Sequence, residues 1–534
     1  MLIRSVYINI TYAALIITAL ISVFIMGCRS YDPEIRNESI FIHLSAEPDT
    51  LNPVTATDAY ASRINSYVYE TLVDRDYETL EIVPLLAESW DISPDKLTYR
   101  FYLRRGVTWH DGREFTADDV VYSYEVLMDP DTLNAHLKAY FIDIKKVEKI
   151  DRYTVEFTYR ERYFLGLEIC GTMPIVPRHI FDDGTDFNTH RNNRFPIGTG
   201  PYRFIGWDTG KRVILELNEN YWGRVPDIKR LVFILVSESN VAFQMLKKGD
   251  LDLYAMRPIQ WERQTGTVRF NEQFRKLKYS LPQYSYIGWN AQSELFSDRR
   301  VRLAMTHLIN REAILEKLLF GLGEMVTGTH YIYSPYYNSD MKPWPYDPGA
   351  AKRLLEEAGW DSKDQRGILT RNGKRFSFTF TIPSGSTFAE RLATIMKEDF
   401  SRHGIHMNIA RYEWAVFIDR LQSRDFEAVT LAWSLGYAGD PYQLWHSSQA
   451  EAGSNYVSFK NSEADRLIEM ARREFNHEKR KQMYHRFHEI LHHEQPYTFL
   501  YANPQLMAVS RRFSNVNVYL KGLDLTEWGI IREQ

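Results

Sequence analysis

Short runs in which apolar and polar residues alternate predict β-strands at several places along the chain. Ile40, Ile42 and Leu44 form one such run, which Pro48 follows. An alternation with period two places every second side chain on one face of a sheet. A second alternating run precedes Gly106, and further strands are predicted at residues 213–222, 230–238, 376–383 and 426–434.

Apolar residues spaced three and four positions apart predict amphipathic helices between these strands. The clearest helix has Asp347 as its N-cap, Pro348 in its first turn and Gly359 as its stop. One continuous helix is predicted from Ser297 or Asp298 to Gly321. Another is predicted over residues 387–404, with one apolar side made of Phe388, Leu392, Ile395, Met396 and Phe400. Strands that alternate with helices indicate α/β lobes.

Composition and charge narrow the class of protein. The chain has 534 residues, 44% of them hydrophobic, which is enough for more than one domain. The formal net charge is −4 and no basic stripe outweighs the acidic residues, so a nucleic-acid partner is not expected. Aromatic residues make up 14%, with 34 Tyr and 12 Trp. This content suits a large binding surface as well as an ordinary large core.

The N-terminus predicts export. Residues 1–27 combine one basic residue, Arg4, with a long apolar stretch, which is typical of a signal peptide. The ending IMGC resembles a bacterial lipobox, so we expect Cys28 to be lipidated and residues 28–36 to form a tether. The alternative is an uncleaved transmembrane anchor, because the stretch is just long enough to span a bilayer. Either reading places the protein outside the cytoplasm, at a membrane. With Cys170 as the only other cysteine, a disulfide framework and a Cys-rich metal site are excluded.

One motif raises a catalytic possibility. His488-Glu489-x-x-His492 is a pattern that can bind zinc on a helix and use the glutamate as a base. The apolar stripe of that helix is expected to face the core, and all three motif residues lie roughly 100° or more from its centre. We therefore expect the two histidines to face mostly solvent, and a zinc metallohydrolase is disfavoured. The stripe consists of Met483, Tyr484, Phe487, Ile490 and Leu491.

No other catalytic constellation is convincing. The spacing of Gly198 and Gly200 also occurs in phosphate loops, but Pro201 and a predicted strand follow them, so a tight turn is expected. No Gly-x-Ser-x-Gly elbow is present. We expect no enzyme activity, no cofactor, no catalytic residue and no metal ligand.

Several segments, in this order, resemble one known family. They are EPDTLNP, LLAESWDISPDKLTYRFYLRRGVTWHDGREFTADDVVYSYEVLMDP, PIGTGPYRFIGW, NENYWGRVPDIKRLVF, KKGDLDLY, YSYIGWN, FSDRRVRLAMTHLINREAI and DPGAAKRLLEEAGW. Together they resemble the family 5 extracellular solute-binding proteins, which are the dipeptide, oligopeptide and nickel receptors of ABC transporters. The resemblance extends over nearly the whole chain after the signal peptide.

The resemblance implies a two-lobe architecture. We expect an α/β, periplasmic-binding-protein-like (Venus-flytrap) fold, in which two crossing hinge strands join the lobes and an extra α+β subdomain is inserted in lobe I. The hinge crossings are expected near Leu281–Tyr284 and Tyr501–Pro504. Ligand binding would close the lobes. The predicted boundaries are lobe I at 37–68, 194–283 and 505–534, the inserted subdomain at 69–193, and lobe II at 284–504.

The resemblance also implies ligand-binding residues. Tyr254 and Tyr284 match positions where lobe I and the hinge approach the ligand, and Trp414 and Trp433 match lobe II aromatics that flank it. The loop at residues 52–60, with Thr57 and Asp58, matches a loop that pairs with the backbone of an extended peptide. Core packing is the alternative for each aromatic residue.

The segment AWSLGYAGDP departs from the family pattern. Peptide receptors of the family carry an aspartate three residues after the tryptophan, which pairs with the α-ammonium of the peptide. This chain has Gly436 there, followed by Tyr437, and the stretch before Asp440 is one residue longer than usual. Asp440 is expected either to replace the missing carboxylate or to shape a turn before Pro441. Recognition of a free N-terminus is therefore in question, since a buried ammonium needs a partner.

The sequence thus predicts an extracytoplasmic receptor that captures a peptide-like solute and delivers it to an ABC permease. The expected partners are the solute, the permease subunits and the membrane lipid, and we expect a monomer. An oligosaccharide or a nickel chelate is the alternative ligand. A lipoprotein that keeps the fold but serves as a chaperone or in surface interactions is a further alternative.

Overall fold

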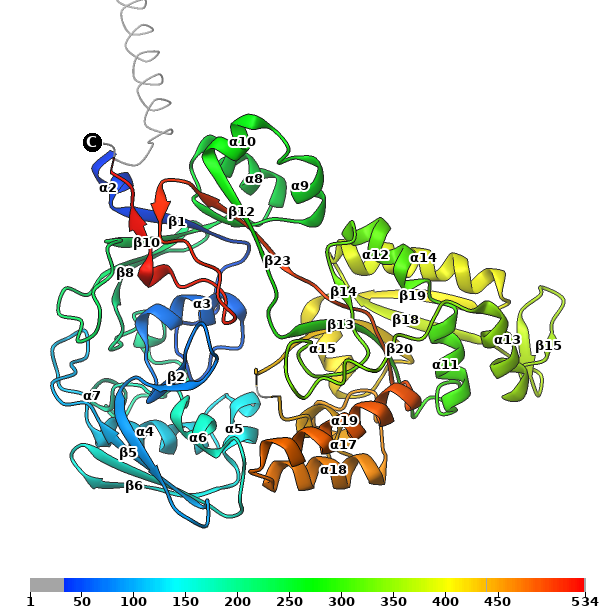
Figure 1. Cartoon of the computed structure of the whole chain (residues 1–534), viewed down its shortest axis with the longest axis horizontal. Helices are drawn as coiled ribbons and strands as arrows, with labels where there is room; N and C mark the ends of the chain where they lie inside the picture. The colour runs from blue at the N-terminus through cyan, green and yellow to red at the C-terminus, as the bar shows by residue number, and fades with distance from the viewer. Residues whose placement is uncertain (1–32, 438, 533–534) are drawn as a thin grey trace, which may run out of the picture.

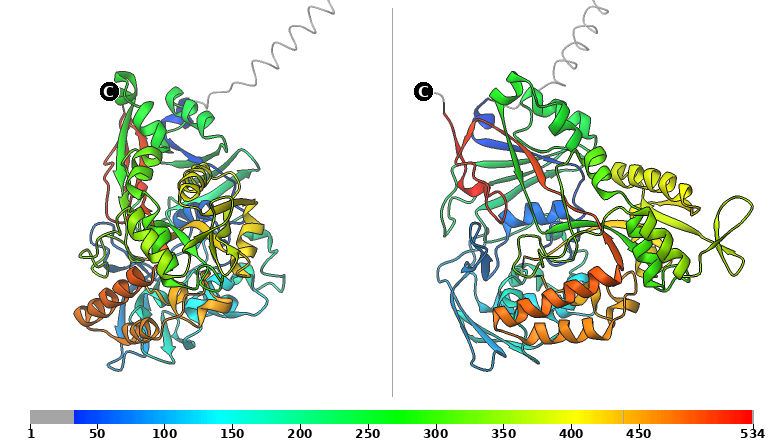
Figure 2. Two further views of the ribbon diagram at one scale, coloured as in Figure 1. Left: turned by 90° about the vertical axis from the view of Figure 1, so that its right-hand side faces the viewer. Right: turned by 45° about the vertical axis from the view of Figure 1, so that its right-hand side comes forward.

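Two lobes joined by a narrow waist make up the protein (Figures 1 and 2). The computed structural model describes residues 33–437 and 439–532. Each lobe is built on its own sheet, and the chain passes between the lobes twice near the middle of the molecule. Cys28 and the predicted signal peptide lie outside the described residues. None of the helices among the described residues combines the length and the apolar character that a membrane span requires.

Lobe I is built on a seven-stranded sheet in the order β12-β23-β11-β1-β10-β9-β8. The predicted strand at residues 40–44 is β1, which lies inside this sheet and pairs in parallel with β10. The elements of lobe I are α2 (Pro33–Asn37), β1 (Ser39–Leu44), α3 (Ala59–Val68), β8 (Tyr202–Asp208), β9 (Arg212–Leu217), β10 (Arg230–Leu235), α8 (Ser239–Lys248), β11 (Leu253–Ala255), α9 (Pro258–Arg263), α10 (Val268–Gln273), β12 (Phe274–Tyr279), β23 (Gln505–Ser510), β24 (Phe513–Ser514), η2 (Leu525–Glu527) and β25 (Gly529–Ile530).

The glycine-rich turn before β8 packs against the end of α3. Gly200 donates its N–H to the carbonyl oxygen of Val68 at 2.9 Å. A Cβ atom at Gly198 would lie 1.8 Å from the same oxygen, so no larger residue fits without displacing backbone. The two glycines therefore serve a close backbone approach, and the next element is a strand, as predicted.

An inserted subdomain carries a four-stranded antiparallel sheet in the order β4-β5-β7-β6. Tyr99, Phe101 and Leu103 of the alternating run point into its core. Its elements are β2 (Val73–Arg75), β3 (Ile82–Pro84), β4 (Ala87–Ile92), β5 (Thr98–Leu103), α4 (Ala117–Met128), α5 (Ala135–Phe141), β6 (Ile144–Asp151), β7 (Thr154–Tyr159), α6 (Gly166–Gly171), α7 (Arg178–Phe181) and η1 (Arg191–Asn193).

Lobe II is built on a five-stranded sheet in the order β19-β18-β20-β13-β21. Its elements are β13 (Gln283–Trp289), α11 (Arg299–His307), α12 (Arg311–Leu319), β14 (Glu324–Met325), α13 (Pro348–Glu357), β15 (Ser362–Lys363), β16 (Leu369–Arg371), β17 (Lys374–Arg375), β18 (Ser377–Pro383), α14 (Thr387–Arg402), β19 (His406–Tyr412), α15 (Trp414–Gln422), β20 (Ala428–Ser434), α16 (Tyr442–Trp445), α17 (Gln449–Ala452), α18 (Ser462–Arg473), α19 (His477–Glu494), β21 (Tyr497–Phe499) and β22 (Tyr501–Ala502).

The helices of lobe II follow their sequence signals with one exception. Asp347 caps α13 by accepting a hydrogen bond from the N–H of Ala350, and Gly359 has a φ of +86° just after the helix, as its stop role requires. The prediction of one helix from Asp298 to Gly321 is wrong, because α11 ends at His307 and α12 begins at Arg311. Asn310 accepts a hydrogen bond from the N–H of Ala313 and so starts a new helix.

The two connections between the lobes lie side by side. One joins β12 to β13, and the other joins β22 to β23 (Figure 1). The side-chain amide of Gln283 on the first donates to the carbonyl oxygen of Asn503 on the second at 2.8 Å. The loops before β13 and after β22 therefore form the waist, while the predicted domain boundaries stay a prediction.

Candidate ligand-binding site

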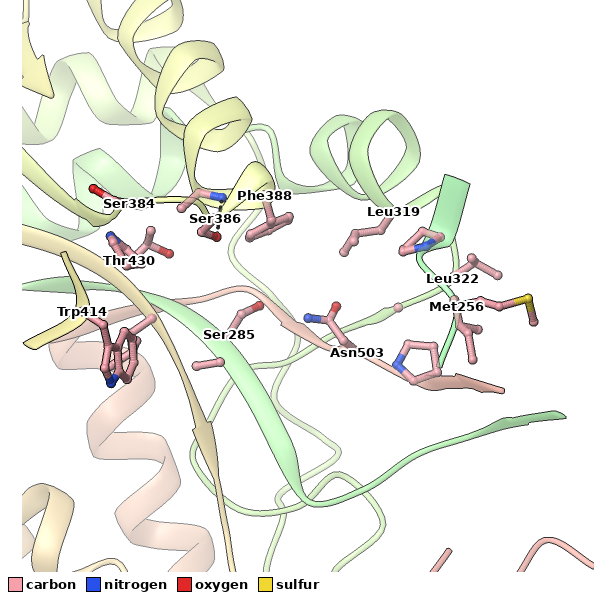
Figure 3. A pocket seen from close by; sticks show the side chains of 18 residues that line it. Met256, Ser285, Leu319, Leu322, Ser384, Ser386, Phe388, Trp414, Thr430 and Asn503 are labelled. Carbon is pink, nitrogen blue, oxygen red and sulfur yellow. Dashed lines mark hydrogen bonds between the residues drawn. The ribbon is translucent and has the colours of Figure 1, made fainter. Parts of the chain in front are cut away.

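A cavity of about 520 Å³ lies between the lobes beside the waist. Figure 3 shows how the sheet of lobe II, the start of α14 and the waist surround it. Lobe I contributes Met256 and Leu506, and lobe II contributes Phe388 and Trp414. Such a position between two lobes is typical of ligand pockets.

One edge of β20 is open at this cavity. Leu435 donates its N–H to the carbonyl oxygen of Pro282, in register with the pairing of β20 and β13. Because alternate residues of an antiparallel pair bond to the partner strand, Ala432 and Ser434 direct their backbone groups to the opposite edge. There β18 pairs with β20 only as far as Val429, and no other described strand covers the edge. Ala432 lines the cavity, so unpaired backbone donors and acceptors face it.

The cavity walls are mostly apolar and carry no charge. None of the described lining residues is Asp, Glu, Lys, Arg or His. The hydroxyls of Ser285 and Thr430 already donate to the backbone carbonyls of Tyr501 and Tyr286. Among the described residues, the buried Oδ1 atom of Asn503 has no hydrogen-bond partner. The cavity thus offers apolar surface, a strand edge and uncharged polar groups such as the Ser384 hydroxyl, but no charge.

The two predicted tryptophans lie on different surfaces. Trp414 begins α15, lines the cavity and is 59% exposed, with its ring stacked on Phe417. The side chain of Trp433 is half-buried in a second cluster, where it is stacked 6.3 Å from Tyr286 and donates its Nε1–H to the hydroxyl of Tyr497. Of these two residues, only Trp414 offers its face to a ligand in the cavity.

The two predicted tyrosines point into the cores. The hydroxyl of Tyr254 is bonded to Ser239 and Gln260, and the side chain is 1% exposed. The hydroxyl of Tyr284 is 3.0 Å from that of Thr329, and burial raises its pKa well above the ordinary value. Neither ring lines the cavity, so the geometry gives both a packing role.

The predicted lobe I loop ends in a helix cap. Asp58 accepts hydrogen bonds from the N–H groups of Tyr60 and Ala61 and so starts α3, whereas Thr57 is exposed. The Asp58 carboxylate is thereby largely committed to the helix.

The loop after β20 reaches both lobe I and the inserted subdomain. Tyr437 donates its hydroxyl to the carbonyl oxygen of Lys521 at 3.2 Å. Asp440 accepts a hydrogen bond from the Tyr163 hydroxyl and another from the Arg472 guanidinium, each at 2.9 Å. Gly436 is exposed, and a Cβ atom there would meet nothing within 4 Å. The Asp440 carboxylate, which was one expected replacement for the missing aspartate, is therefore already paired.

This Asp440–Arg472–Tyr163 cluster, the clasp, joins lobe II to the inserted subdomain. The side chain of Asp440 is 9% exposed and that of Arg472 is 22% exposed. Although burial opposes the charged form, Asp440 keeps the pKa of Arg472 above its ordinary value. Beside it, the N–H of Phe164 donates to the backbone carbonyl of Arg472, at the place where α18 lies against the subdomain (Figure 1).

The prediction that the motif histidines face solvent is wrong. His488 is fully buried, its Nδ1 accepts the N–H of Asn338, and its Nε2 lies 3.0 Å from the Thr327 hydroxyl. His492 is buried against Trp344, whose ring is stacked 5.0 Å away. Burial lowers the pKa of His488 to about 3 and that of His492 to about 4, so both are neutral at pH 7.

The histidines are buried because the loop after β14 covers the polar side of α19 in the tertiary structure. Both ring nitrogens of His488 are used within the fold, which leaves none for a metal. No group of three or more His, Cys, Asp or Glu side chains suited to a metal occurs among the described residues.

Several residues of the cavity carry no distinctive sequence signal. Met256, Phe388, Ser285 and Asn503 line it, yet each sits in a pattern that also fits ordinary packing. Asn503 had the clearest sequence signal for a place in the cavity, because Asn503-Pro504 lies in a predicted hinge crossing, between the two lobes.

Comparisons with known proteins agree with this geometry. Residues 81–455 match the profile of the bacterial extracellular solute-binding proteins, family 5, middle region. The oligopeptide-binding protein AppA of Bacillus subtilis is 32% identical over 487 residues, covering 89% of this chain and 88% of that protein. The dipeptide-binding protein of Escherichia coli is 28% identical over 481 residues, covering 84% and 86%.

Solved structures give the same result. The structure of AppA from Bacillus subtilis in complex with a nonapeptide has a TM-score of 0.82 at 30% identity, covering 92% of this chain and 99% of that one. NikZ from Campylobacter jejuni in complex with Ni(L-His) has a TM-score of 0.79 at 26% identity, covering 92% and 99%. The profile match, the 32% identical relative and the two-lobe fold together show that this chain belongs to the family 5 bacterial extracellular solute-binding proteins.

Proposed function

We propose that this protein is the extracytoplasmic receptor of an ABC transporter and captures a peptide-like solute between its lobes. The single observation that carries the choice of ligand is the open edge of β20 at Ala432 and Ser434. An extended peptide can pair with such an edge through its own backbone, while its side chains occupy flanking pockets. The cavity beside the edge supplies apolar walls for those side chains.

The mechanism follows from the waist. Met256 and Leu506 of lobe I and Trp414 and Phe388 of lobe II line one cavity, so a ligand contacts both lobes at once. Such a ligand stabilises the closed arrangement to the extent that it binds that arrangement better than the open one. The permease then recognises the closed receptor. No bond of the solute is broken in this scheme.

The residues proposed for the site are of three kinds. Trp414 faces the cavity, and the backbone of β20, with Gly436 two residues beyond its end, forms the open edge beside it. The second kind would not touch the solute but would hold the cavity walls in place; these residues are Tyr254, Tyr284, Trp433, Thr57 and Asp58. Tyr437 and Asp440 would act through closure, because both bridge from lobe II to other parts of the molecule.

The proposal also places the receptor at the membrane and names its protein partners. Lipidation at Cys28 would tether the receptor to the membrane, and the transmembrane subunits of the permease would be its protein partners. The support is the resemblance of the N-terminus to a lipobox and the membership of the family. We expect the receptor to act as a monomer.

Native mass spectrometry of residues 29–534, purified gently from the source cells, tests the ligand class. Masses spaced like amino-acid residues on the folded protein would support a peptide receptor. Hexose spacing or a single metal-chelate adduct would overturn the peptide assignment and keep the receptor role. A protein that binds none of these and does not change shape with any solute would favour a chaperone or surface role.

A further inference from the structure

Arg63 on α3 is a cation with almost no partner. A guanidinium has five N–H donors and stays charged at neutral pH. The structure gives Arg63 one contact, a long one of 3.4 Å from Nη1 to the carbonyl oxygen of His43. Among the described residues it forms no ion pair. Its side chain is only partly exposed, and burial lowers its pKa below the ordinary value.

Two other arginines without a carboxylate partner, the partly buried Arg424 and the buried Arg311, are satisfied differently. Arg424 donates to the carbonyl oxygens of Gly453 at 2.7 Å and Ala450 at 2.9 Å. Arg311 donates to the carbonyl oxygens of Phe499 and Trp344. A partly buried charge that lacks such contacts is costly to the fold. Arg63 therefore differs from these arginines, because most of its N–H donors have no acceptor within the fold.

The position of Arg63 connects it to the ligand cavity. His43 is the penultimate residue of β1, next to β11, and its ring centroid lies 5.0 Å from that of Tyr254. Met256 follows Tyr254 by two residues and lines the cavity. Arg63 is thus linked to the lobe I wall of the cavity through His43 and Tyr254, and it stands on the helix that Asp58 caps, beside the residues that line the cavity.

The surroundings of Arg63 also face lobe II. The hydroxyls of Tyr67 and Tyr279 are close enough to interact electrostatically with its guanidinium. Tyr279 in turn interacts with Tyr437 of lobe II and lines a second cavity, of about 490 Å³, with Tyr331 of lobe II. Phenol hydroxyls are hydrogen-bond donors, so they add to the donors that Arg63 supplies.

The nearby carboxylates are engaged elsewhere. Asp524 interacts with Tyr67 and Tyr77 but accepts hydrogen bonds from the N–H and the hydroxyl of Thr526. Asp74 forms an ion pair with Lys521. Neither forms an ion pair with Arg63.

We infer that Arg63, with the hydroxyls of Tyr67 and Tyr279, binds a carboxylate of the solute. This inference rests on the proposed receptor function and adds the chemistry of one end of the ligand. The body of the ligand would occupy the uncharged cavity, and its carboxylate would reach the face of α3. Asp440 is paired and Gly436 has no side chain, so neither offers a carboxylate to the ammonium of a peptide. The site therefore recognises the C-terminal carboxylate of a peptide in preference to its N-terminal ammonium.

Isothermal titration with one tripeptide in four forms tests this inference. Trileucine is used with its N-terminus free or acetylated, and with its C-terminus as a free acid or as an amide. The wild-type protein is expected to bind both acids roughly 10- to 100-fold more tightly than the matching amides, as for other hydrogen bonds to charged groups. Acetylation is expected to change affinity by less than about threefold, because no carboxylate awaits the amine.

Arg63→Met removes the charge with little change in volume. The ratio of acid to amide affinity is expected to collapse to about one in this variant, and Arg63→Lys is expected to restore part of it. The melting temperature of ligand-free Arg63→Met should equal or exceed that of the wild type, which a structural role for Arg63 would not give. A trileucine amide in which one leucine is replaced by glutamate shows whether a side-chain carboxylate serves as well.

The possible outcomes separate the two claims. If none of the four forms binds, the proposed peptide function fails, and the inference fails with it. If the peptides bind but acid and amide bind equally, or if Arg63→Met keeps the preference for acid, the role of Arg63 is refuted while the receptor stands. Loss of folding in Arg63→Met shifts the decision to Arg63→Lys and to the acid and amide pair on the wild type.

Discussion

Asp440→Asn is the most informative substitution in the clasp. The change removes one negative charge and keeps the size of the side chain. In the native protein one carboxylate oxygen of Asp440 accepts from both Tyr163 and Arg472 at 2.9 Å. After the change, Arg472 keeps a weaker partner, Asp143, at 3.5 Å. The substitution thus leaves a largely buried guanidinium short of a charged partner.

The magnitude follows from the exposure of the pair. Removing one partner of a fully buried ion pair costs about 3–5 kcal/mol, whereas an exposed pair contributes about 0–1 kcal/mol. Asp440 is 9% exposed and Arg472 is 22% exposed, and Asp143 offers partial compensation. We therefore expect Asp440→Asn to lower the free energy of unfolding by about 1–3 kcal/mol.

Urea unfolding followed by tryptophan fluorescence measures this change, and the neighbouring ion pair provides a matched control. Arg473 and Glu161 also join α18 to the inserted subdomain, but their side chains are 59% and 64% exposed. Arg473→Gln should cost less than about 0.5 kcal/mol. Equal effects of Asp440→Asn and Arg473→Gln would refute the reasoning. Unchanged stability with lost binding of free-amine peptides would instead make Asp440 the ligand's partner.

Three further predictions concern other parts of the molecule. The pKa of His488 is about 3 in the folded protein, below the ordinary 6.5. As the pH falls below 6.5, the unfolded chain therefore binds a proton at His488 and the folded chain does not, which lowers the stability of the fold. His488→Asn should therefore reduce the loss of stability between pH 6.5 and 4 by up to about 1.4 kcal/mol per pH unit, measured by urea unfolding, and parallel pH curves would contradict this. Gly436→Asp places a carboxylate in open space at a position without positive φ, and titration should show about tenfold tighter binding of free-amine over acetylated peptides, a ratio that stays near one if the site lies elsewhere. Trp414→Ala should weaken peptide binding roughly 10- to 100-fold while the unfolding free energy changes by less than about 1 kcal/mol, because the ring is 59% exposed; unaltered affinity would exclude it from the site.

Local sequence patterns were sufficient to predict many of the elements. β5 was predicted because its alternation is produced by burial on one sheet face, which is a local property. β1 was predicted from the alternation of Ile40, Ile42 and Leu44, although the strand is buried on both faces. The N-cap at Asp347 and the glycine stop at Gly359 are likewise local. The family fold was predicted because many such segments occur in a recognisable order.

Features that depend on long-range packing were not predictable in this way. The face of α19 that carries His488 is polar in sequence, yet the loop with Thr327 and Asn338, about 150 residues earlier, covers it. Helical periodicity shows which face is apolar, but it does not show which polar face another segment will cover. The break at Asn310 is a local competition between capping and continuation, which the sequence signals did not resolve.

The site shows the same division. Trp414, which the family resemblance implies as a ligand contact, lines the cavity, and its contact with a ligand stays a prediction. The partners of Asp440 come from 277 and 32 residues away, so its engagement could not be foreseen. Arg63 is notable for contacts that it lacks, and such a lack becomes visible only when every neighbour is in place.

Hydrogen exchange at the open edge of β20 tests the central claim most directly. The amides of Ala432 and Ser434 face the cavity edge, whereas the backbone of Leu431 and Trp433 is bonded to β13. If the receptor binds a peptide by extending this sheet, adding a saturating peptide should slow exchange at residues 432 and 434 by at least about tenfold, with little change at 431 and 433. Tight peptide binding that leaves exchange at residues 432 and 434 unchanged would contradict the account.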